Sequence, residues 1–406
     1  MINLKRHTSI ALLYFLLVSL MGTFLRFFYV FPVPANYTFV LHTHSHTALL
    51  GWVYIGFTTL IYKIFLAPSK KETLYKRIFL FTNICIVGML VTFPVQGYAL
   101  FSIIFSTLFL FASYWFSWFS CKYVSPKLKK RFSWKLIKAG LFYLVFSSLG
   151  PWAVGGIMAT LGKGSIWYKL AIYFYLHFQY NAWFIFAILG VLFYILEEAG
   201  LSFPQKNLNS FFLFLNAGVI LSLFLSGLWV QPPLIFYLLG AAGAIFQILA
   251  FYRLFLLLRD QPVLSCFSTR AGNLLKIAGI LILGKISMQL LTAFPFFADL
   301  AFSHSDLVIG YLHWTFLGII SICLLSFLHH FKLLQFPKFF FPIYFFGFVF
   351  SEILIFYKGA SLWLGLPFID HYFVILAVVS CTFPIAIGWL FIRNFDLKNS
   401  VFAPGR

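Results

Sequence analysis

Acidic and charged residues are scarce in this sequence. Only 9 of its 406 residues are Asp or Glu, and charged residues of both signs make up 9%. A water-soluble globular domain usually contains about a quarter charged residues, so the composition excludes an ordinary soluble fold. Hydrophobic residues make up 62%, which is typical of a chain embedded in lipid. We therefore expect an all-α polytopic membrane protein.

Cysteine is also sparse, and its spacing is uninformative. The five cysteines are scattered, and none forms a CxxC pair. The absence of CxxCH argues against covalently attached heme. The connections between the apolar segments are too short for a soluble domain, so any chemistry is expected inside the bilayer.

Apolar runs of about 20 residues, the length that crosses a bilayer, predict twelve transmembrane helices in a single transmembrane domain. The helices are expected to group into three pseudo-symmetric arcs of four, with repeats at approximately 1–135, 136–270 and 271–406. The predicted spans are 9–31, 38–66, 78–95, 98–120, 138–160, 168–196, 208–229, 234–257, 274–297, 306–330, 338–357 and 368–392.

Basic residues gather in every second connection, although the formal net charge of +20 alone would suit a nucleic-acid partner. The alternation is the positive-inside pattern, so the basic charge orients the chain in a lipid bilayer, and no nucleic acid is expected. We expect a bacterial inner-membrane protein with both termini cytoplasmic and an uncleaved first helix. The outer side has Arg26, Lys163, Lys169 and Lys358. The inner side has Lys70, Lys71, Lys76, Arg77, Lys122 through Lys138, Lys206, Arg253, Arg259, Arg270, Lys276, Lys332, Lys338, Arg393, Lys398 and Arg406.

Histidine recurs inside the apolar helices at nearly equal intervals. His44 and His177 are 133 residues apart, and His177 and His313 are 136 apart. Each lies on the second helix of its arc, roughly 9–12 Å in from the outer end at 1.5 Å per residue. Imidazole inside a bilayer is usually functional, and repeat interfaces commonly hold binding sites. A central heme or metal site between the three helices is therefore predicted.

The HTHSH run on the second helix has a useful geometry. At about 100° per residue, His42 and His46 lie within roughly 40° of each other, while His44 points about 200° away. One helix is thus able to serve two sites, one on each side. The alternative is that two of the three histidines face polar neighbours and only one binds a ligand.

Three other polar side chains are candidates for catalysis. Tyr180 lies one turn below His177, Glu352 is expected at the histidine level, and Lys285 is near mid-depth. Glu352 is able to fix the tautomer of a ligating imidazole, and Lys285 is expected to pair with a carboxylate or to line a proton path. The alternatives are that His177 is a hydrogen-bonded core residue and that Glu352 contacts only interfacial water.

The segment LHTHSHTALLGW resembles the HxHxxxLGW segment in subunit I of the C-type heme-copper oxidases. A histidine motif on the second helix is also similar to the NnrS-like heme and copper membrane proteins. The oxidase resemblance implies a twelve-helix fold in three arcs with histidine on helices 2, 6 and 10. It also implies that two histidines of one helix serve a low-spin and a high-spin heme on opposite sides.

The sequence departs from that family in its histidines. A family oxidase uses six, whereas five are at the right depth here, and the adjacent pair on helix 7 is missing because that helix reads FFLFLNAGVILSLFLSGLW. The double-histidine motif is on helix 2 rather than helix 10. We therefore expect weak or absent oxygen reduction.

Three functions remain open. The first is a heme protein that binds or reduces a diatomic gas, nitric oxide or oxygen, or passes electrons, with one or two b-type hemes at His42, His44, His46 and His313. Copper or non-heme iron at His177, His42 and His46 would accompany it. The second is a catalytic terminal oxidase or nitric oxide reductase supplied by a quinol or cytochrome donor. The third is a metal-free transporter or a copper or heme assembly factor.

Overall fold

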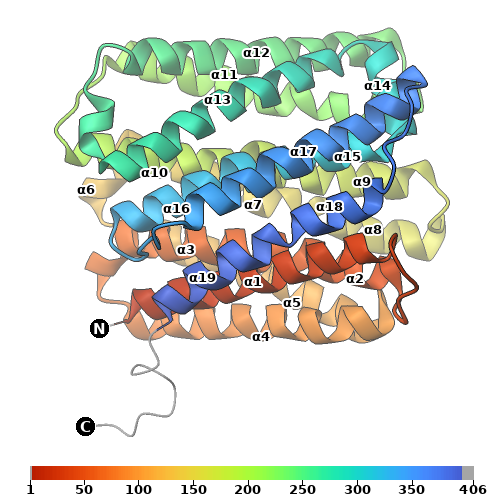
Figure 1. Cartoon of the computed structure of the whole chain (residues 1–406). Helices are drawn as coiled ribbons and strands as arrows, with labels where there is room; N and C mark the ends of the chain where they lie inside the picture. Colours follow the sequence, from red (N-terminus) through yellow and green to blue (C-terminus); the bar gives the residue numbers. More distant parts are fainter. Residues whose placement is uncertain (1, 396–406) are drawn as a thin grey trace, which may run out of the picture. The chain divides into compact units, whose positions relative to one another are not determined.

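The computed structural model describes residues 2–395, which form helices joined by turns and contain no strand (Figure 1). Twelve helical spans in this part of the chain are long and apolar enough to cross a bilayer. The chain is therefore an all-α polytopic membrane protein, as predicted. The basic residues Lys398 and Arg406 lie outside the described residues.

Each predicted span overlaps one observed span, with ends that differ by a few residues. The apolar pattern places the spans well, but it underestimates helices that extend into basic turns. The observed spans are Leu4–Phe27, Tyr37–Ser69, Glu72–Gln96, Leu100–Tyr123, Phe132–Thr160, Ile166–Glu198, Gln205–Val230, Leu234–Leu258, Thr269–Leu291, Ser305–His330, Phe340–Leu364 and Tyr372–Asn394.

One span is divided where the sequence predicted a single helix at 138–160. It begins earlier and separates at Ser148 into α7 (Phe132–Ser147) and α8 (Leu149–Thr160). Pro151 lies in the first turn of α8 and has no N–H to donate to the carbonyl four residues before it. The hydrogen-bond ladder is interrupted there, which explains the break.

The helix predicted at 274–297 ends earlier than expected. α13 spans Thr269–Leu291, and a short separate helix, α14 (Pro295–Ser303), follows it. Pro295 occupies the first turn of α14, where a missing N–H is tolerated. The proline therefore starts a new helix instead of ending the old one.

The contacts divide the chain into two compact units. Unit 1 comprises Met1–Ser125, Leu324–Ser361 and Leu366–Arg406, and unit 2 comprises Pro126–Cys323 and Leu362–Gly365. The third predicted repeat, 271–406, is shared between them. The single domain with three arcs stays a prediction.

In unit 1, helix α1 (Leu4–Phe27) packs against the helix that begins at Tyr37 and against the helices at the carboxyl end of the chain. Phe15 stacks on Trp52 with ring centroids 4.4 Å apart. Gly51 faces the Tyr14 ring so closely that an added Cβ would lie 2.8 Å from its Cγ. The missing side chain lets the two helices approach, as is common in membrane helix packing.

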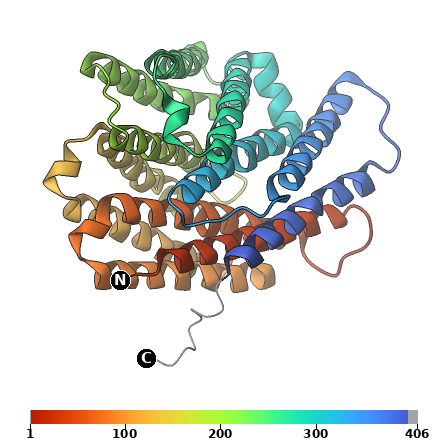
Figure 2. The same ribbon diagram turned by 60° about the vertical axis from the view of Figure 1, so that its left-hand side comes forward.

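In unit 2, α11 (Gln205–Ser222) and α12 (Leu234–Leu258) lie side by side (Figures 1 and 2). A Cβ at Gly243 would lie 2.2 Å from the backbone nitrogen of Ser222, so the backbones meet there. Gln247 donates to the Ser222 hydroxyl at 2.7 Å. Small residues and interhelical hydrogen bonds hold this pair together, as expected inside a bilayer.

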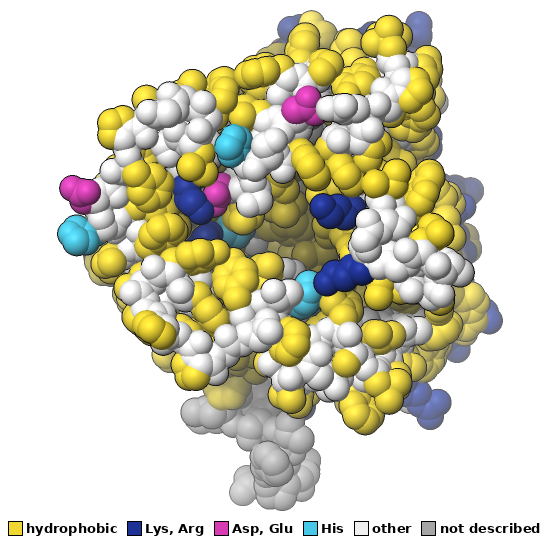
Figure 3. Space-filling view, turned by 90° about the vertical axis from the view of Figure 1, so that its right-hand side faces the viewer, with side chains coloured by type: hydrophobic (Ala, Val, Ile, Leu, Met, Phe, Trp, Pro, Cys, Tyr) yellow, Lys and Arg dark blue, Asp and Glu magenta, His cyan; other side chains and the backbone are white. Residues whose placement is uncertain are grey.

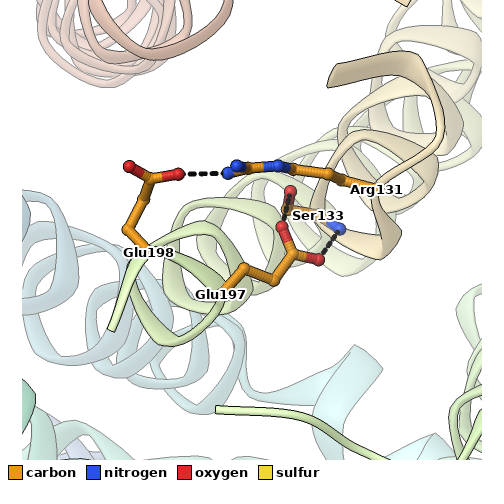
Figure 4. A network of polar contacts seen from close by, with 4 residues as sticks. All are labelled: Arg131, Ser133, Glu197 and Glu198. Atoms are coloured by element: carbon orange, nitrogen blue, oxygen red, sulfur yellow. Dashed lines mark hydrogen bonds and ion pairs between the residues drawn. The ribbon is translucent and has the colours of Figure 1, made fainter. Parts of the chain in front are cut away.

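A carboxylate from one helix caps another in unit 2 (Figure 4). Glu197, near the end of α10 (Phe184–Glu198), accepts from the backbone N–H of Ser133 at 3.0 Å and from its hydroxyl at 2.6 Å. These donors lie in the first turn of α7, where negative charge is favourable. Arg131 forms an ion pair with Glu198 beside this cap. The two glutamates thus fix one end of α10 against α7.

The surface is largely apolar. Hydrophobic side chains cover much of the face shown in Figure 3, where uncharged polar groups, backbone, and scattered charged groups and histidines are also visible. Large apolar side chains elsewhere are strongly exposed, including Val95 at 79% and Ile392 at 73%. Such exposure is expected where a helix faces lipid rather than water.

Candidate functional site

Three long helices change from α- to π-helical geometry directly after a histidine. α2 (Tyr37–His46), α9 (Ile166–His177) and α15 (Ser305–His313) each end on that residue. The π-helical segments that follow are η1 (Thr47–Tyr54), η4 (Phe178–Trp183) and η7 (Trp314–Ile320). π-helical turns are rare and frequently occur at functional sites.

The π-helical segments would change the alignment of the predicted repeats, which stay a prediction. The residue at the junction of the first helix is His46, whereas the sequence spacing was counted from His44. His46 is thus the local counterpart of His177 and His313. No sequence signal distinguished the two, because only the hydrogen-bond pattern of the backbone reveals where the π-helical turn begins.

His44 has one ring nitrogen fixed by the protein. Its Nδ1–H donates to the backbone carbonyl of Val18 at 3.0 Å, and a carbonyl accepts only, so the proton is on Nδ1. Gly22 makes room for the ring, since a Cβ there would lie 2.9 Å from Cε1. Nε2 makes no hydrogen bond to any described residue. A histidine held in this way has the orientation usual for a metal ligand.

His42 and His46 lie on a different face from His44, as the helical geometry predicted. His46 donates from Nδ1 to the carbonyl of His42 at 2.9 Å, and its Nε2 accepts from the Tyr98 hydroxyl at 3.1 Å. The His42 ring meets the Tyr98 ring edge to face with centroids 4.6 Å apart. Tyr98 was missed from the sequence, because it comes from the connection after α4 (Glu72–Gln96).

His177 has both ring nitrogens engaged. It is 1% exposed, and its Nε2–H donates to the carbonyl of Val219 at 2.8 Å. The side-chain amide of Asn181 donates to Nδ1 at 3.1 Å. A metal ion at His177 would have to displace one of these hydrogen bonds.

Lys285 continues this network. Lys285 is 3% exposed, and its ammonium donates to the amide oxygen of Asn181 at 2.5 Å and to that of Gln289 at 2.7 Å. Both acceptors are neutral amides and not the carboxylate that was one of the two alternatives, and a place of Lys285 on a proton path stays a prediction. Gln289 was missed, although its position four residues after Lys285 on one helix face was a usable signal.

Tyr180 and Tyr311 lie near this cluster in different ways. The Tyr180 ring contacts the Tyr311 ring with centroids 6.0 Å apart. Lys285 Nζ lies 5.7 Å from the centroid of the Tyr311 ring, so the tyrosine that meets the cation is Tyr311. The Tyr311 hydroxyl is buried and has no hydrogen-bond partner among residues 2–395.

His313 is the last residue of α15, and the next residue, Trp314, holds the following turn against α13. Trp314 donates from its indole to the carbonyl of Leu281 at 2.8 Å. The same indole lies against Gly284, where a Cβ would be 2.7 Å from its Cζ2. His313 itself is half-buried. Its role as a ligand stays a prediction.

Glu352 is buried on α17 (Phe340–Leu364), with 3% of its surface exposed. Glu352 belongs to unit 1, as does the HTHSH segment. The positive charge of Arg26 interacts electrostatically with its carboxyl group. Its burial speaks against contact with interfacial water alone. A hydrogen bond from Glu352 to a ligating imidazole stays a prediction.

The predicted ligands are divided between the units. His42, His44 and His46 belong to unit 1, whereas His177 and His313 belong to unit 2. No group of three or more His, Cys, Asp or Glu side chains within the described part of the chain is placed to hold a metal ion. The shared central site of the three helices stays a prediction.

The chain was also compared with known proteins. No protein-family model matches it, and no curated protein matches it.

Proposed function

We propose that this membrane protein binds b-type heme through His44 and handles a diatomic gas or passes electrons. The single observation that supports this proposal most is the state of the His44 ring. Its Nδ1–H is held by the Val18 carbonyl, and its Nε2 makes no hydrogen bond to any described residue. The residues at this position therefore fit an axial ligand of heme iron.

His313 is proposed as the second axial ligand, because it lies on the second helix of its predicted repeat and ends its α-helix just before a π-helical segment. Heme iron with histidine ligands supplies gas binding and electron transfer. The chain's part is to orient each imidazole, and Gly22 and the Val18 carbonyl do so for His44. A quinol or a cytochrome is the proposed electron donor.

His42 and His46 are proposed as ligands of a second metal or of a gas-binding heme. Neutral imidazole binds copper, zinc and iron alike, which leaves either copper or non-heme iron as the metal. His177 fits this role less well, because Val219 and Asn181 occupy its two nitrogens. With two imidazoles rather than three, the site favours gas binding over oxygen reduction.

We place the protein in the bacterial inner membrane with both termini cytoplasmic, because its basic residues alternate between connections. This orientation puts the amino-terminal ends of α2, α9 and α15 on the outer side. We propose that the chain has the architecture of the heme-copper oxidase superfamily. This proposal rests on the HTHSH segment and the three histidine-bearing helices.

The test is the absorption spectrum of protein purified from a heme-sufficient host. We expect a low-spin b-type spectrum that is lost or converted in His44→Ala and in His313→Ala. The matched control is Ser45→Ala, one residue along the same helix, which should leave the spectrum unchanged. Added imidazole should restore the spectrum of His44→Gly, because it replaces the missing ligand without restoring any other contact.

A wild-type protein without heme would overturn the proposal, as would wild-type spectra in both histidine variants. Reduced protein should also bind nitric oxide or carbon monoxide, and this binding should be lost in His42→Ala. Robust oxygen consumption with a quinol would instead favour a catalytic oxidase.

A further inference from the structure

Unit 2 contains a buried ammonium without a carboxylate partner. Lys285 is 3% exposed, and its hydrogen-bond acceptors are the neutral amides of Asn181 and Gln289. Arg131 and Arg259, which also belong to unit 2, form ion pairs with Glu198 and Asp260. Buried charges in proteins are normally paired as well as hydrogen-bonded. The positive charge at Lys285 is therefore not balanced by the described residues.

The orientation of Asn181 follows from its two partners. Its amide oxygen accepts from Lys285, so its NH₂ group must face His177 and donate to Nδ1. His177 in turn donates from Nε2 to the Val219 carbonyl. Every group in this chain of hydrogen bonds points its donors away from the ammonium, and none offers a negative charge to it.

The surroundings of Lys285 also contain hydrogen-bond donors that lack an acceptor among the described residues. An ammonium has three N–H groups, and two of them are used by Asn181 and Gln289. The Tyr311 hydroxyl is buried without a partner, and its ring lies beside Lys285. Tyr180 and Phe316 pack nearby, with their ring centroids 6.1 Å apart. The group that would complement this arrangement is a small hydrogen-bond acceptor with negative charge.

We propose that Lys285 and Tyr311 bind a small monovalent anion of the size of chloride, nitrite or formate. The same positive charge disfavours a metal cation at the neighbouring His177. A water molecule would satisfy the hydrogen bonds but would leave the charge unbalanced, which is why the anion is preferred. The proposal goes beyond heme binding and does not depend on it, because neither Lys285 nor Tyr311 is a proposed heme ligand.

The experiment measures the melting temperature of purified full-length protein in detergent at constant ionic strength. Sodium chloride, nitrite or formate replaces sodium gluconate, whose anion is too large for a closely packed site. A ligand that binds the folded state stabilises it as its concentration exceeds the dissociation constant. For the wild type we expect a saturable rise on the order of 5 °C.

Two variants and one matched control locate the effect. Lys285→Met should abolish the dependence on the anion and should melt in gluconate at or above the wild-type temperature, because a buried unbalanced charge has been removed. Lys276→Met makes the same change at an exposed position of α13 and should keep the full response. Tyr311→Phe should fold normally and show a response at least threefold weaker in apparent affinity.

The outcomes separate the possibilities. Equal wild-type melting temperatures in all four salts would overturn the proposal and indicate a bound water or an uncharged Lys285 amine. A response that survives in Lys285→Met, or one of unchanged apparent affinity in Tyr311→Phe if Lys285→Met does not fold, would assign the anion to another place and overturn it too. The heme spectrum, recorded on the same samples, reports separately on the proposed function.

Discussion

His44 in unit 1 and His177 in unit 2 both lie on an α-helix that continues into a π-helical segment, but His44 is half-buried, His177 is buried, and the protein uses their nitrogens differently. The Val18 carbonyl holds one nitrogen of His44 and leaves the other without a hydrogen bond. Val219 and Asn181 hold both nitrogens of His177. A histidine with one fixed nitrogen is oriented for a ligand, whereas one with two fixed nitrogens is part of the framework.

The surroundings of the two histidines differ in charge as well. Asn181 connects His177 to the Lys285 ammonium, so the polar centre of unit 2 is positive. The His44 ring lies against a backbone carbonyl and a glycine. The positive charge of Lys285 thus disfavours a metal cation at His177.

The strongest test of the difference between His44 and His177 is to replace each histidine in turn. His44→Ala should lose the low-spin heme spectrum completely, because the axial ligand is gone. His177→Ala should keep the spectrum but lower stability by about 1–3 kcal/mol, since the buried Val219 carbonyl loses its donor. Absorption spectra and thermal unfolding of both variants provide the check. Loss of heme from His177→Ala alone would reverse the assignment.

The next largest effect is expected at Asn181. Replacing it with Leu leaves the Lys285 ammonium with one fewer acceptor, which should cost about 3–5 kcal/mol in the free energy of unfolding, as for a broken buried pair. The double variant Asn181→Leu/Lys285→Met should recover most of the loss, because the charge is then removed as well. Unfolding in mixed micelles measures both.

The control for this prediction is Asn209→Leu at an exposed position of α11, which should change stability by less than about 0.5 kcal/mol. Additive losses in the double variant would show that Asn181 and Lys285 do not act as one network.

A smaller effect is expected from Gly22→Ala in α1. The new Cβ would lie 2.9 Å from Cε1 of His44, so the ring must shift. Overpacking of this kind costs about 1–3 kcal/mol, and we expect a shifted heme spectrum with lower heme occupancy. Gly279→Ala, where a Cβ meets nothing within 4 Å, should instead stabilise the helix by about 0.5–1 kcal/mol. Identical spectra in wild type and Gly22→Ala would contradict the proposed role of this glycine.

The sequence predicted the helices and the two faces of HTHSH because both depend on local properties, namely hydropathy and the rotation per residue. It did not predict the Val18 and Val219 carbonyls, since every residue has a carbonyl and no residue type marks one that accepts from a histidine. The contact between Asn181 and Lys285 joins positions 104 residues apart. Only the packed fold brings these side chains together.

In the hydrogen bonding of its ring nitrogens, His46 is intermediate between His44 and His177. A change at this histidine gives the smallest expected effect. Its Nδ1 is fixed by the His42 carbonyl, but its Nε2 is held by Tyr98, which is 51% exposed. Such a hydrogen bond contributes about 0.5–1.5 kcal/mol and competes with any metal that binds the same nitrogen. Tyr98→Phe removes the competitor and leaves the aromatic ring in place.

Tyr98→Phe should therefore bind Zn²⁺ or Cu²⁺ at His42 and His46 about two- to tenfold more tightly than the wild type, because one hydrogen bond need no longer be broken. Titration of metal-free protein with either ion, followed by calorimetry, measures the change. The variant His46→Ala provides the background, since it lacks the nitrogen itself. Weaker binding in Tyr98→Phe would mean that the Tyr98 hydroxyl is a metal ligand rather than a competitor. The metal site would then contain the Tyr98 oxygen as well as His46. Unchanged binding would mean that Nε2 of His46 is not the ligating atom.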